Sequence, residues 1–336
     1  MRIYLAGEVR RVDWALCGTV KRERLDWLAE NPRSPRRFAM LVGRRWRTAT
    51  IKDVAWALRL DWETVKELEK EYRAEPLRRI GPPAPEGIGI DEISLRKGHP
   101  YRIVVSALIR GRPIWFGGGD RSEASLAQFY RWLGPKQGRR VRLPLRDMGK
   151  PFANATRAAL PGAAILFDKF QVMRPLGEAL AQVRKSEYAR LSGPERRFIK
   201  GPKYALLSPR ENLTWDGRRA LREVRRINRR LNVAYGLKEA FGQLWDYQRE
   251  AWAWKCFQNW RSALRWQRLR PDQKFARTIE KPWPGIAAYC QPENKVSLGY
   301  VEGLNNKIRG IQRRAYGSRD EASLRLKVLT GTRPQI

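Results

Sequence analysis

The hydrophobic and polar positions of residues 87–117 predict three consecutive β-strands. Ile88 and Ile90 alternate with small or polar residues, and residues 101–109 are rich in β-branched side chains. Such runs are typical of strands. Short segments containing glycine and proline separate the runs and predict tight turns. Because tight turns join neighbouring antiparallel strands, we expect a three-stranded meander.

A pattern of alternating helices and strands follows the meander. The residues from Asp120 to Glu123 have the spacing of a capping box and open a helix that is expected to end at Gly134. Residues 140–146 alternate between basic and apolar side chains, as in a strand. A helix is expected to begin at Pro151, and residues 163–167 read as a buried strand. This order indicates an α/β fold with a mixed sheet.

Residues 36–73 have the periodicity of helices. Thr50 and Asp61 each precede an apolar helical pattern, a position where these residue types cap helices. Three helices with this spacing predict a helix-turn-helix, and the basic setting favours DNA binding over the alternative of an ordinary three-helix packing unit. Acidic residues on the third helix weaken the case for tight contact with the groove. The candidate DNA contacts of that helix are Trp62, Lys66 and Lys70.

Residues 169–285 are predicted to be almost entirely helical. Arginine recurs there every three or four positions, which places a basic stripe along a helix. A solvated surface is the usual explanation, but so many like charges repel one another without counter-ions, so we favour contact with phosphate. The candidate contacts are Arg218, Arg222, Arg225, Arg226 and Arg229. The tryptophans between residues 245 and 266 are expected to be mostly core, with one exposed tryptophan stacking on a DNA base as the less favoured alternative.

The segment around Glu302 is predicted to form a helix with two faces. Val301, Leu304 and Ile308 share an apolar face, and Glu302 stands on a polar and basic face. A carboxylate that leads a basic face suits a helix lying against both a metal site and DNA. The candidate DNA contacts of this face are Asn306, Arg309 and Arg313.

The charge balance indicates the kind of partner. The 336 residues include 69 Lys and Arg against 34 Asp and Glu, a formal net charge of +35. Such an excess favours long polyanions, with nucleic acid first among them. The sequence has no run of about 20 apolar residues, as a membrane span requires, and its first residues lack the apolar core of a signal peptide. We therefore expect a cytoplasmic, nucleoid-associated protein.

The scarcity of histidine and cysteine restricts the chemistry. His99 is the only histidine, so mechanisms that need a histidine base or several histidine ligands are nearly excluded. The three cysteines are far apart and form no C-x-x-C pair, so neither a zinc finger nor a disulfide framework is expected. Carboxylates acting with hard cations remain.

Three acidic residues are candidates for such a metal site. Asp91 is in the middle of the first predicted strand, Asp147 ends a later strand, and Glu302 is on the late helix. An acidic side chain in an apolar strand is costly to bury unless it is paired or binds a cation, although it could face solvent on an edge strand. Two-metal phosphoryl transfer needs a few carboxylates around two Mg²⁺ ions, with Mn²⁺ as an alternative ion.

Several segments of the sequence occur together in a known family. They are Gly89-Ile90-Asp91-Glu92, Lys97-Gly98-His99, Asp147-Met148, Phe167-Asp168-Lys169-Phe170, Leu244-Trp245-Asp246-Tyr247, Val301-Glu302-Gly303-Leu304-Asn305-Asn306-Lys307-Ile308 and Arg313-Arg314-Ala315-Tyr316-Gly317. In this order they resemble the ISL-three insertion-sequence transposases, from about residue 36 to residue 329. The resemblance implies an α/β ribonuclease H-like core, with an N-terminal helix-turn-helix and a large all-α insertion before the last catalytic residue. It assigns the catalytic and metal-binding roles to Asp91, Asp147 and Glu302.

The sequence departs from the family pattern at three points. Family members usually open with a cysteine-containing zinc module, so we expect a shortened start. Gln171 stands where the family has a histidine. Pro144 lies in the strand before Asp147, and this strand should be interior, where proline removes a ladder hydrogen bond. Asp168 is therefore the reserve candidate for the second acidic residue.

The predicted function is that of a DDE transposase, which binds the terminal inverted repeats of its element and cleaves and transfers DNA strands with two metal ions. Its expected partners are double-stranded DNA, at the element ends and at the target, and a second copy of the chain in a homodimer. One alternative is a catalytically inactive, transposase-derived DNA-binding protein. Another is a ribonuclease H-like, structure-specific nuclease.

These predictions divide the sequence into six segments. They are a basic N-terminal segment (1–34), a helix-turn-helix DNA-binding domain (35–80), a Pro-rich linker (81–86), the first part of the ribonuclease H-like core (87–171), a helical insertion domain (172–292) and a C-terminal helical part of the core (293–336).

Overall fold

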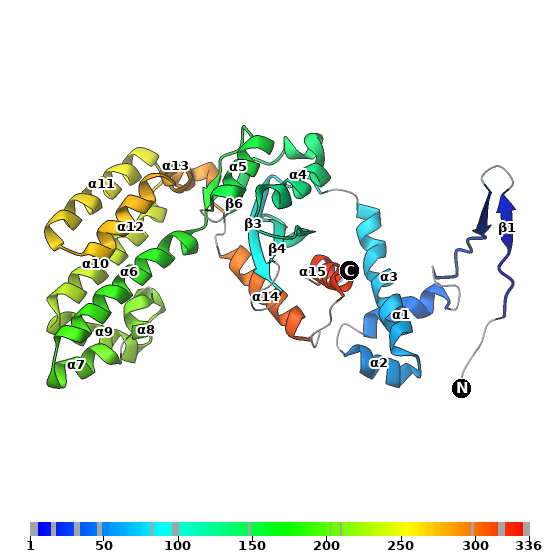
Figure 1. The fold of residues 1–336 in the computed structure, drawn as a ribbon, viewed down its shortest axis with the longest axis horizontal. Helices are drawn as coiled ribbons and strands as arrows, with labels where there is room; N and C mark the ends of the chain where they lie inside the picture. Colours follow the sequence, from blue (N-terminus) through cyan, green and yellow to red (C-terminus); the bar gives the residue numbers. More distant parts are fainter. Residues whose placement is uncertain are drawn as a thin grey trace. The chain divides into compact units, whose positions relative to one another are not determined.

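The chain forms two compact units in the computed structural model (Figure 1). One unit combines Met1–Gly81 with Gly310–Ile336, and the other is Pro82–Arg309. The structure describes residues 6–14, 18–29, 34–45, 49–80, 83–95, 101–146, 149–201, 203–208, 210–296, 299–314 and 320–331.

The larger unit is built on a five-stranded mixed sheet of order β5-β4-β3-β6-β7. The strands β3 (Gly87–Ser94), β4 (Tyr101–Ala107) and β5 (Arg112–Gly117) form the predicted antiparallel meander. The strands β6 (Leu143–Arg146) and β7 (Leu166–Phe167) extend it in parallel. The mixed α/β architecture is therefore confirmed, and it is consistent with a ribonuclease H-like core.

Two helices, α4 (Glu123–Gly138) and α5 (Lys150–Ala159), pack on the sheet. Phe129 of α4 meets Trp115 edge to face at 5.7 Å within a core that also includes isoleucines of β3 and β4. The helix α4 differs from its prediction at the start, because its N-cap is Ser122 and not Asp120. At Gly134 the backbone leaves the helical region (φ 76°, ψ 160°), so the predicted helix ends there and a second short helical stretch follows at once.

Pro144 lies inside the interior strand β6, as the sequence suggested, and the strand nevertheless pairs with both neighbours. Pro144 stands opposite Ile88 of β3. On the other side, β7 is only two residues long and its pairing begins at Leu145, beyond the proline. Backbone hydrogen bonds on this side are kept before and after the proline, because the N–H groups of Ala164 and Asp168 donate to the carbonyls of Arg142 and Arg146.

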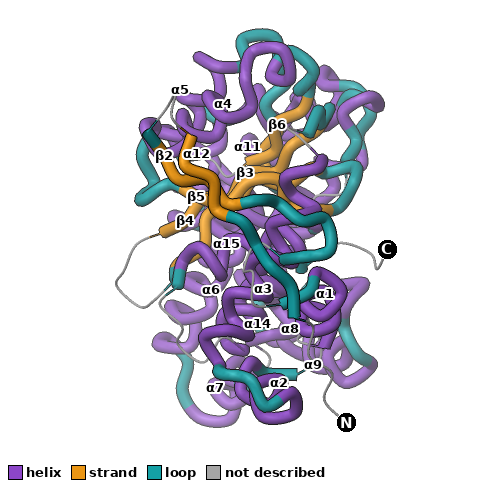
Figure 2. The backbone as a smooth tube through the Cα atoms, turned by 90° about the vertical axis from the view of Figure 1, so that its right-hand side faces the viewer, coloured by secondary structure: helices purple, strands orange, loops and turns teal. Residues whose placement is uncertain are grey.

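A long helical segment follows β7, and Figure 2 draws its helices in purple. Two short 3-10 turns, Arg210–Asn212 and Gln243–Asp246, lie between its helices, and two more, Ala288–Cys290 and Pro292–Asn294, follow the last one. The helices are α6 (Lys169–Arg190), α7 (Gly193–Lys200), α8 (Lys203–Leu207), α9 (Trp215–Ile227), α10 (Arg229–Gly242), α11 (Glu250–Gln267), α12 (Arg270–Glu280) and α13 (Trp283–Ala287).

Aromatic packing joins this segment to the sheet. The ring centroid of Phe241 lies 5.0 Å from those of Trp260 and Phe275. Phe167 of β7 belongs to the same apolar cluster. The prediction that the tryptophans are mostly core was wrong. Trp245 and Trp260 are buried, whereas three others are exposed: Trp252, Trp254 and Trp266, the last to 85%. Helix periodicity alone did not separate these two groups.

The smaller unit contains the three predicted helices α1 (Arg36–Arg45), α2 (Ile51–Leu58) and α3 (Trp62–Ile80). Thr50 and Asp53 form a capping box on α2, and Asp61 accepts hydrogen bonds from the first backbone N–H groups of α3. A hairpin of β1 (Arg11–Trp14) and β2 (Thr19–Arg22) precedes them. Val42, Val54, Val65 and Leu68 form the core of the three helices.

The C-terminal segment is shared between the two units. The helix α14 (Tyr300–Arg314) begins in the larger unit, which ends at Arg309, and α15 (Glu321–Thr330) packs against α3 in the smaller one. The sequence analysis had grouped all of 293–336 with the core, and it gave no sign of the contact between α15 and α3. Among the described residues, no helix is long and apolar enough to cross a membrane.

Candidate active site

Asp91 lies on an interior strand of the sheet. Its strand, β3, pairs with β4 on one side and with β6 on the other, so the alternative of an edge strand does not apply. The side chain is half-buried, and its Oδ1 accepts a 2.8 Å hydrogen bond from the backbone N–H of Glu92. The carboxylate is therefore held by a rigid element in the middle of the fold.

The helix α14 lies close to β3 because Gly89 has no side chain. A Cβ at Gly89 would stand 2.5 Å from Cγ2 of Val301, well inside van der Waals contact. One helical turn later, Asn305 Nδ2 donates a 2.6 Å hydrogen bond to Asp91 Oδ2. Four helical residues advance about 6 Å, and two strand residues advance about 6.6 Å. Val301 can therefore contact Gly89 while Asn305 contacts Asp91, because the two spacings along helix and strand are nearly equal.

The predicted faces of α14 are confirmed, and they determine where Glu302 points. Val301, Leu304 and Ile308 are buried, whereas Glu302 is exposed. The candidate DNA contacts Asn306, Arg309 and Arg313 are also exposed.

Asp168, the reserve candidate, interacts electrostatically with Glu302. Burial raises the pKa of Asp168 to about 6, and the negative charge of Glu302 contributes to the rise. Its Oδ1 accepts a 2.7 Å hydrogen bond from the N–H of Phe170, so it also caps α6. Asp168 thus has a structural role whether or not it binds a cation.

Asp147 lies outside the described residues. Its predecessor, Arg146, pairs with Ile90, the predecessor of Asp91, in the parallel register of β6 and β3. Over the described ranges, no group of three or more His, Cys, Asp or Glu side chains could hold a metal ion. The role of Asp147 as the second of the three predicted carboxylates therefore stays a prediction.

The described donors nevertheless fit a hard cation. Asp91 and Glu302 offer carboxylate oxygens, and Oδ1 of Asn305 is buried without a hydrogen-bond partner among the described residues. Mg²⁺ prefers oxygen ligands and keeps several waters, so few protein ligands suffice. Asn305 was not among the predicted site residues. The sequence feature that could have identified Asn305 is a polar amide on the otherwise apolar helical face of Val301 and Ile308.

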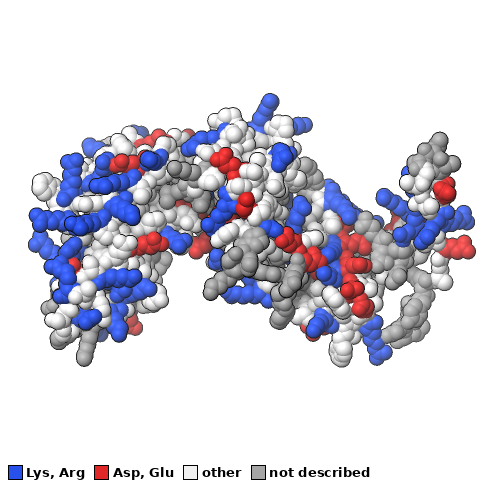
Figure 3. All heavy atoms as spheres, viewed as in Figure 1, with Lys and Arg blue, Asp and Glu red and all other residues white. Residues whose placement is uncertain are grey.

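The arginine stripe lies on α9 and at the start of α10, and the structure divides it into two groups. Arg218, Arg222, Arg226 and Arg229 are exposed. Arg225 is half-buried, where its Nε donates a 2.7 Å hydrogen bond to Asn232 and its guanidinium lies over the ring of Tyr235. Figure 3 shows Lys and Arg side chains spread over the helical segment. Arg226 forms an ion pair with Glu223, and Arg218 donates to the carbonyl of Leu213, but all four exposed residues remain on the surface, as contact with phosphate requires.

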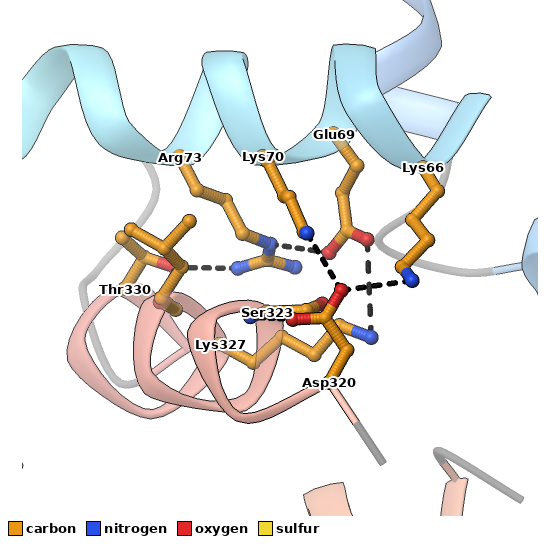
Figure 4. A network of polar contacts seen from close by, with 9 residues as sticks. Lys66, Glu69, Lys70, Arg73, Asp320, Ser323, Lys327 and Thr330 are labelled. Carbon is orange, nitrogen blue, oxygen red and sulfur yellow. Dashed lines mark hydrogen bonds and ion pairs between the residues drawn. The ribbon is translucent and has the colours of Figure 1, made fainter. Parts of the chain in front are cut away.

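The candidate lysines of α3 already bind a carboxylate. Lys66 and Lys70 place their Nζ atoms 2.8 and 2.6 Å from Oδ2 of Asp320, which caps α15 (Figure 4). Partial burial opposes the effect, but the two lysines hold the pKa of Asp320 below its usual range. Trp62, the third candidate, is half-exposed.

A second set of contacts on the same face ties α15 to α3. Glu69 is almost wholly buried and accepts a 2.7 Å hydrogen bond from Arg73, while Lys327 lies 3.8 Å away. Arg73 also donates a hydrogen bond to Thr330 at the end of α15 (Figure 4). The helix α15 therefore covers the side of α3 that carries residues 66, 69, 70 and 73.

A mixed sheet with an aspartate on its interior strand and a glutamate on a late helix beside it is consistent with a nucleic-acid-processing enzyme of the ribonuclease H-like class. The chain belongs to the ISL-three family of DDE transposases. The model of this family, described as a transposase, matches residues 88–328. A transposase family implies DNA as the partner, with cleavage and strand transfer as its general chemistry.

Curated relatives agree with this family. The chain is 32% identical over 330 residues to the transposase for insertion sequence element IS1001 of Bordetella parapertussis, covering 97% of this chain and 80% of the relative. It is 28% identical over 306 residues to the transposase for insertion sequence element IS1557 of Mycobacterium tuberculosis, covering 83% of this chain and 68% of the relative.

Proposed function

We propose that this chain binds the terminal inverted repeats of an insertion sequence, cleaves DNA at its ends and joins the freed 3′ ends to target DNA. The observation that carries the proposal is the placement of Asp91 and Glu302 on two elements that Gly89 and Asn305 hold together. Membership of a DDE transposase family supports the same reaction.

Asp91, Asp147 and Glu302 would hold two Mg²⁺ or Mn²⁺ ions. When bound, the ions activate the attacking oxygen and stabilise the leaving oxygen of the phosphodiester. The role of the chain is to fix the ligands. Asp91 is held on the sheet by the N–H of Glu92 and by Asn305, and Glu302 is carried by the helix anchored at Val301.

DNA would be held by two surfaces with different tasks. The exposed arginines of the helical segment provide charge for phosphate, which gives affinity without sequence preference. The three helices α1–α3 would read the element ends as a helix-turn-helix, with Trp62, Lys66 and Lys70 as contacts. The ion pairs of both lysines with Asp320 would then have to open or rearrange on DNA. A homodimer would bring two ends together.

The test is strand cleavage by the Glu302→Gln variant on duplexes that carry the element ends. Glutamine keeps the size of the side chain and removes its charge, so cleavage should be lost while DNA binding is kept. Asp91→Asn should behave in the same way. Cleavage at the wild-type rate by either variant would refute the assignment. A wild-type protein that binds ends without cutting them would favour the inactive, transposase-derived alternative.

The second acidic ligand needs its own comparison. Asp147→Asn should abolish cleavage, and Asp168→Asn should retain it. Asparagine is a good helix cap, so it can still accept the hydrogen bond from Phe170, which makes this a clean substitution. If Asp168→Asn is inactive and Asp147→Asn is active, Asp168 is the second ligand.

A further inference from the structure

Asn305 is a buried polar residue on an otherwise apolar helical face. It is 7% exposed and lies between Val301 and Ile308 along the buried side of α14. An amide in such a place costs stability unless its polar atoms are hydrogen-bonded. A leucine or valine would extend the apolar face without that cost, so the amide calls for an explanation.

Within the described part of the chain, only the NH₂ group of the Asn305 amide has a hydrogen-bond partner. Nδ2 donates to Asp91 Oδ2 at 2.6 Å. Because an ionised carboxylate can only accept hydrogen bonds, the NH₂ group must face Asp91 and the oxygen must point elsewhere. That oxygen, Oδ1, is buried and lacks a hydrogen-bond partner among the described residues. A buried acceptor left unpaired typically costs about 1–3 kcal/mol.

We propose that Asn305 is a positioning residue of the metal site, an inference that rests on the proposed function. Its Nδ2 fixes the rotamer of Asp91 and directs the remaining lone pairs of the carboxylate to the cation. Its Oδ1, which is buried without a hydrogen-bond partner among the described residues, would accept a hydrogen bond from a water held by that cation. Mg²⁺ keeps several waters when it binds proteins, and outer partners of this kind orient metal ligands.

A purely structural role for Asn305 makes a different prediction. If the hydrogen bond to Asp91 served only to dock α14 on the sheet, its loss would lower thermal stability and leave the intrinsic metal affinity unchanged. Val301 already docks the helix against Gly89, one turn away. The two roles therefore separate when metal affinity and stability are measured on the same variants.

The experiment measures binding of Mn²⁺ alone to the full chain, without DNA, by titration calorimetry. Loss of an outer partner of a metal ligand typically weakens metal affinity by about 10- to 100-fold. We expect this loss for Asn305→Ala and for Asn305→Leu. Leucine suits the apolar face, so the second variant should fold even if alanine leaves a damaging cavity.

Asn306→Ala is the matched control on the same helix. Asn306 is exposed and is a candidate contact for DNA, not for the metal, so in this DNA-free measurement its loss should leave Mn²⁺ affinity unchanged. Wild-type Mn²⁺ affinity in a folded Asn305→Leu protein would overturn the proposal, whatever its melting temperature.

Asp91→Asn distinguishes failure of this inference from failure of the proposed function. If Asp91→Asn loses Mn²⁺ binding and the Asn305 variants keep it, only the role of Asn305 is wrong. If Asp91→Asn binds Mn²⁺ as the wild type does, the metal site itself is wrong, and the inference falls with it.

Discussion

The amide of Asn305 and the carboxylate of Asp91 form a 2.6 Å hydrogen bond between residues that are 214 positions apart in the sequence. The helical segment α6–α13 lies between them in the sequence. The carboxylate on β3 therefore depends on a partner that the chain supplies only beyond the helical segment. The same helix meets β3 at Gly89, where a side chain would clash with Val301.

We predict that Gly89→Ala destabilises the protein and disturbs the site. The new Cβ would meet Val301 at 2.5 Å and Ser106 Oγ at 2.9 Å, so α14 or β4 must move. Overpacking of a tight core contact typically costs about 1–3 kcal/mol. Thermal melting should show the loss of stability, and metal-dependent cleavage should fall with it.

Gly303→Ala is the control for this prediction. Gly303 is on the same helix, and a Cβ there would meet no atom within 4 Å. Alanine at a helical glycine typically stabilises by about 0.5–1 kcal/mol. Equal effects of the two substitutions on melting would mean that the contact of Gly89 with Val301 does not position α14.

Patterns local to one element could be predicted from the sequence. The cap at Thr50, the cap at Asp61 and the two faces of α14 all depend on residues within one helical turn. The meander likewise follows from period-two alternation and its turns. Each of these features is decided by a few neighbouring side chains.

Features that depend on tertiary partners could not be predicted. The position of α15 on α3 rests on pairs such as Lys66 with Asp320, which lie far apart in the sequence. The arginine periodicity gave no sign that Arg225 turns inward to Asn232 while Arg222 stays exposed. The pattern of α14 predicted a site role for Asn306, which lies on the polar face, and none for Asn305, which lies on the apolar face.

We predict that Asp272→Asn changes the pH dependence of stability. Asp272, in the first turn of α12, is fully buried, and neither carboxylate oxygen has a hydrogen-bond partner from another described residue. Burial raises its pKa from 3.8 to about 6. The folded state thus binds a proton more tightly than the unfolded state, and stability falls as the pH rises from about 4 to 6.

At 1.36 kcal/mol per pKa unit, this rise corresponds to a loss on the order of 3 kcal/mol above pH 6. Asparagine carries no charge, so the variant should melt higher than the wild type at pH 7 and 8. The difference should shrink towards pH 4. A pH-independent difference in melting temperature between the two proteins would show that Asp272 stays ionised in the fold.

We predict that the exposed arginines of the stripe and Arg225 respond differently to substitution. Each neutralised phosphate contributes about −0.9 to the slope of log K against log salt concentration. Replacing Arg218, Arg222 and Arg229 together with glutamine should flatten the slope by up to about 2.7, at 0.9 per contact, if each arginine binds one phosphate. The loss should be equal for element-end and scrambled duplexes.

Arg225→Gln is the internal control for the stripe. Because Arg225 donates to Asn232 and contacts Tyr235, its substitution should lower the melting temperature and leave the slope of log K against log salt concentration unchanged. Binding titrations at several salt concentrations provide both readouts on DNA. An unchanged slope in the triple variant would move the phosphate contacts to another part of the chain.

The last prediction concerns Asp320→Asn, which should free Lys66 and Lys70 without removing the cap of α15. Asparagine is as good a helix cap as aspartate, so the hydrogen bond from the N–H of Ser323 can persist. Only 16% of the Asp320 side chain is exposed, and the two lysines hold its pKa below the usual range, so the lost ion pairs stabilise the fold at neutral pH. The melting temperature at neutral pH should therefore fall.

If the two lysines bind DNA, the Asp320→Asn variant should bind duplexes more tightly and with a steeper salt dependence. The increase in slope should reach about 1.8 when both lysines contact phosphates, at 0.9 each. Deleting residues 1–80 would be a poorer test, because it would also strip α3 from α15. The double variant Lys66→Gln, Lys70→Gln in the Asp320→Asn background should cancel the gain. A gain that survives the double variant would show that the lysines of α3 are not the DNA contacts and that Asp320 acts through its own negative charge.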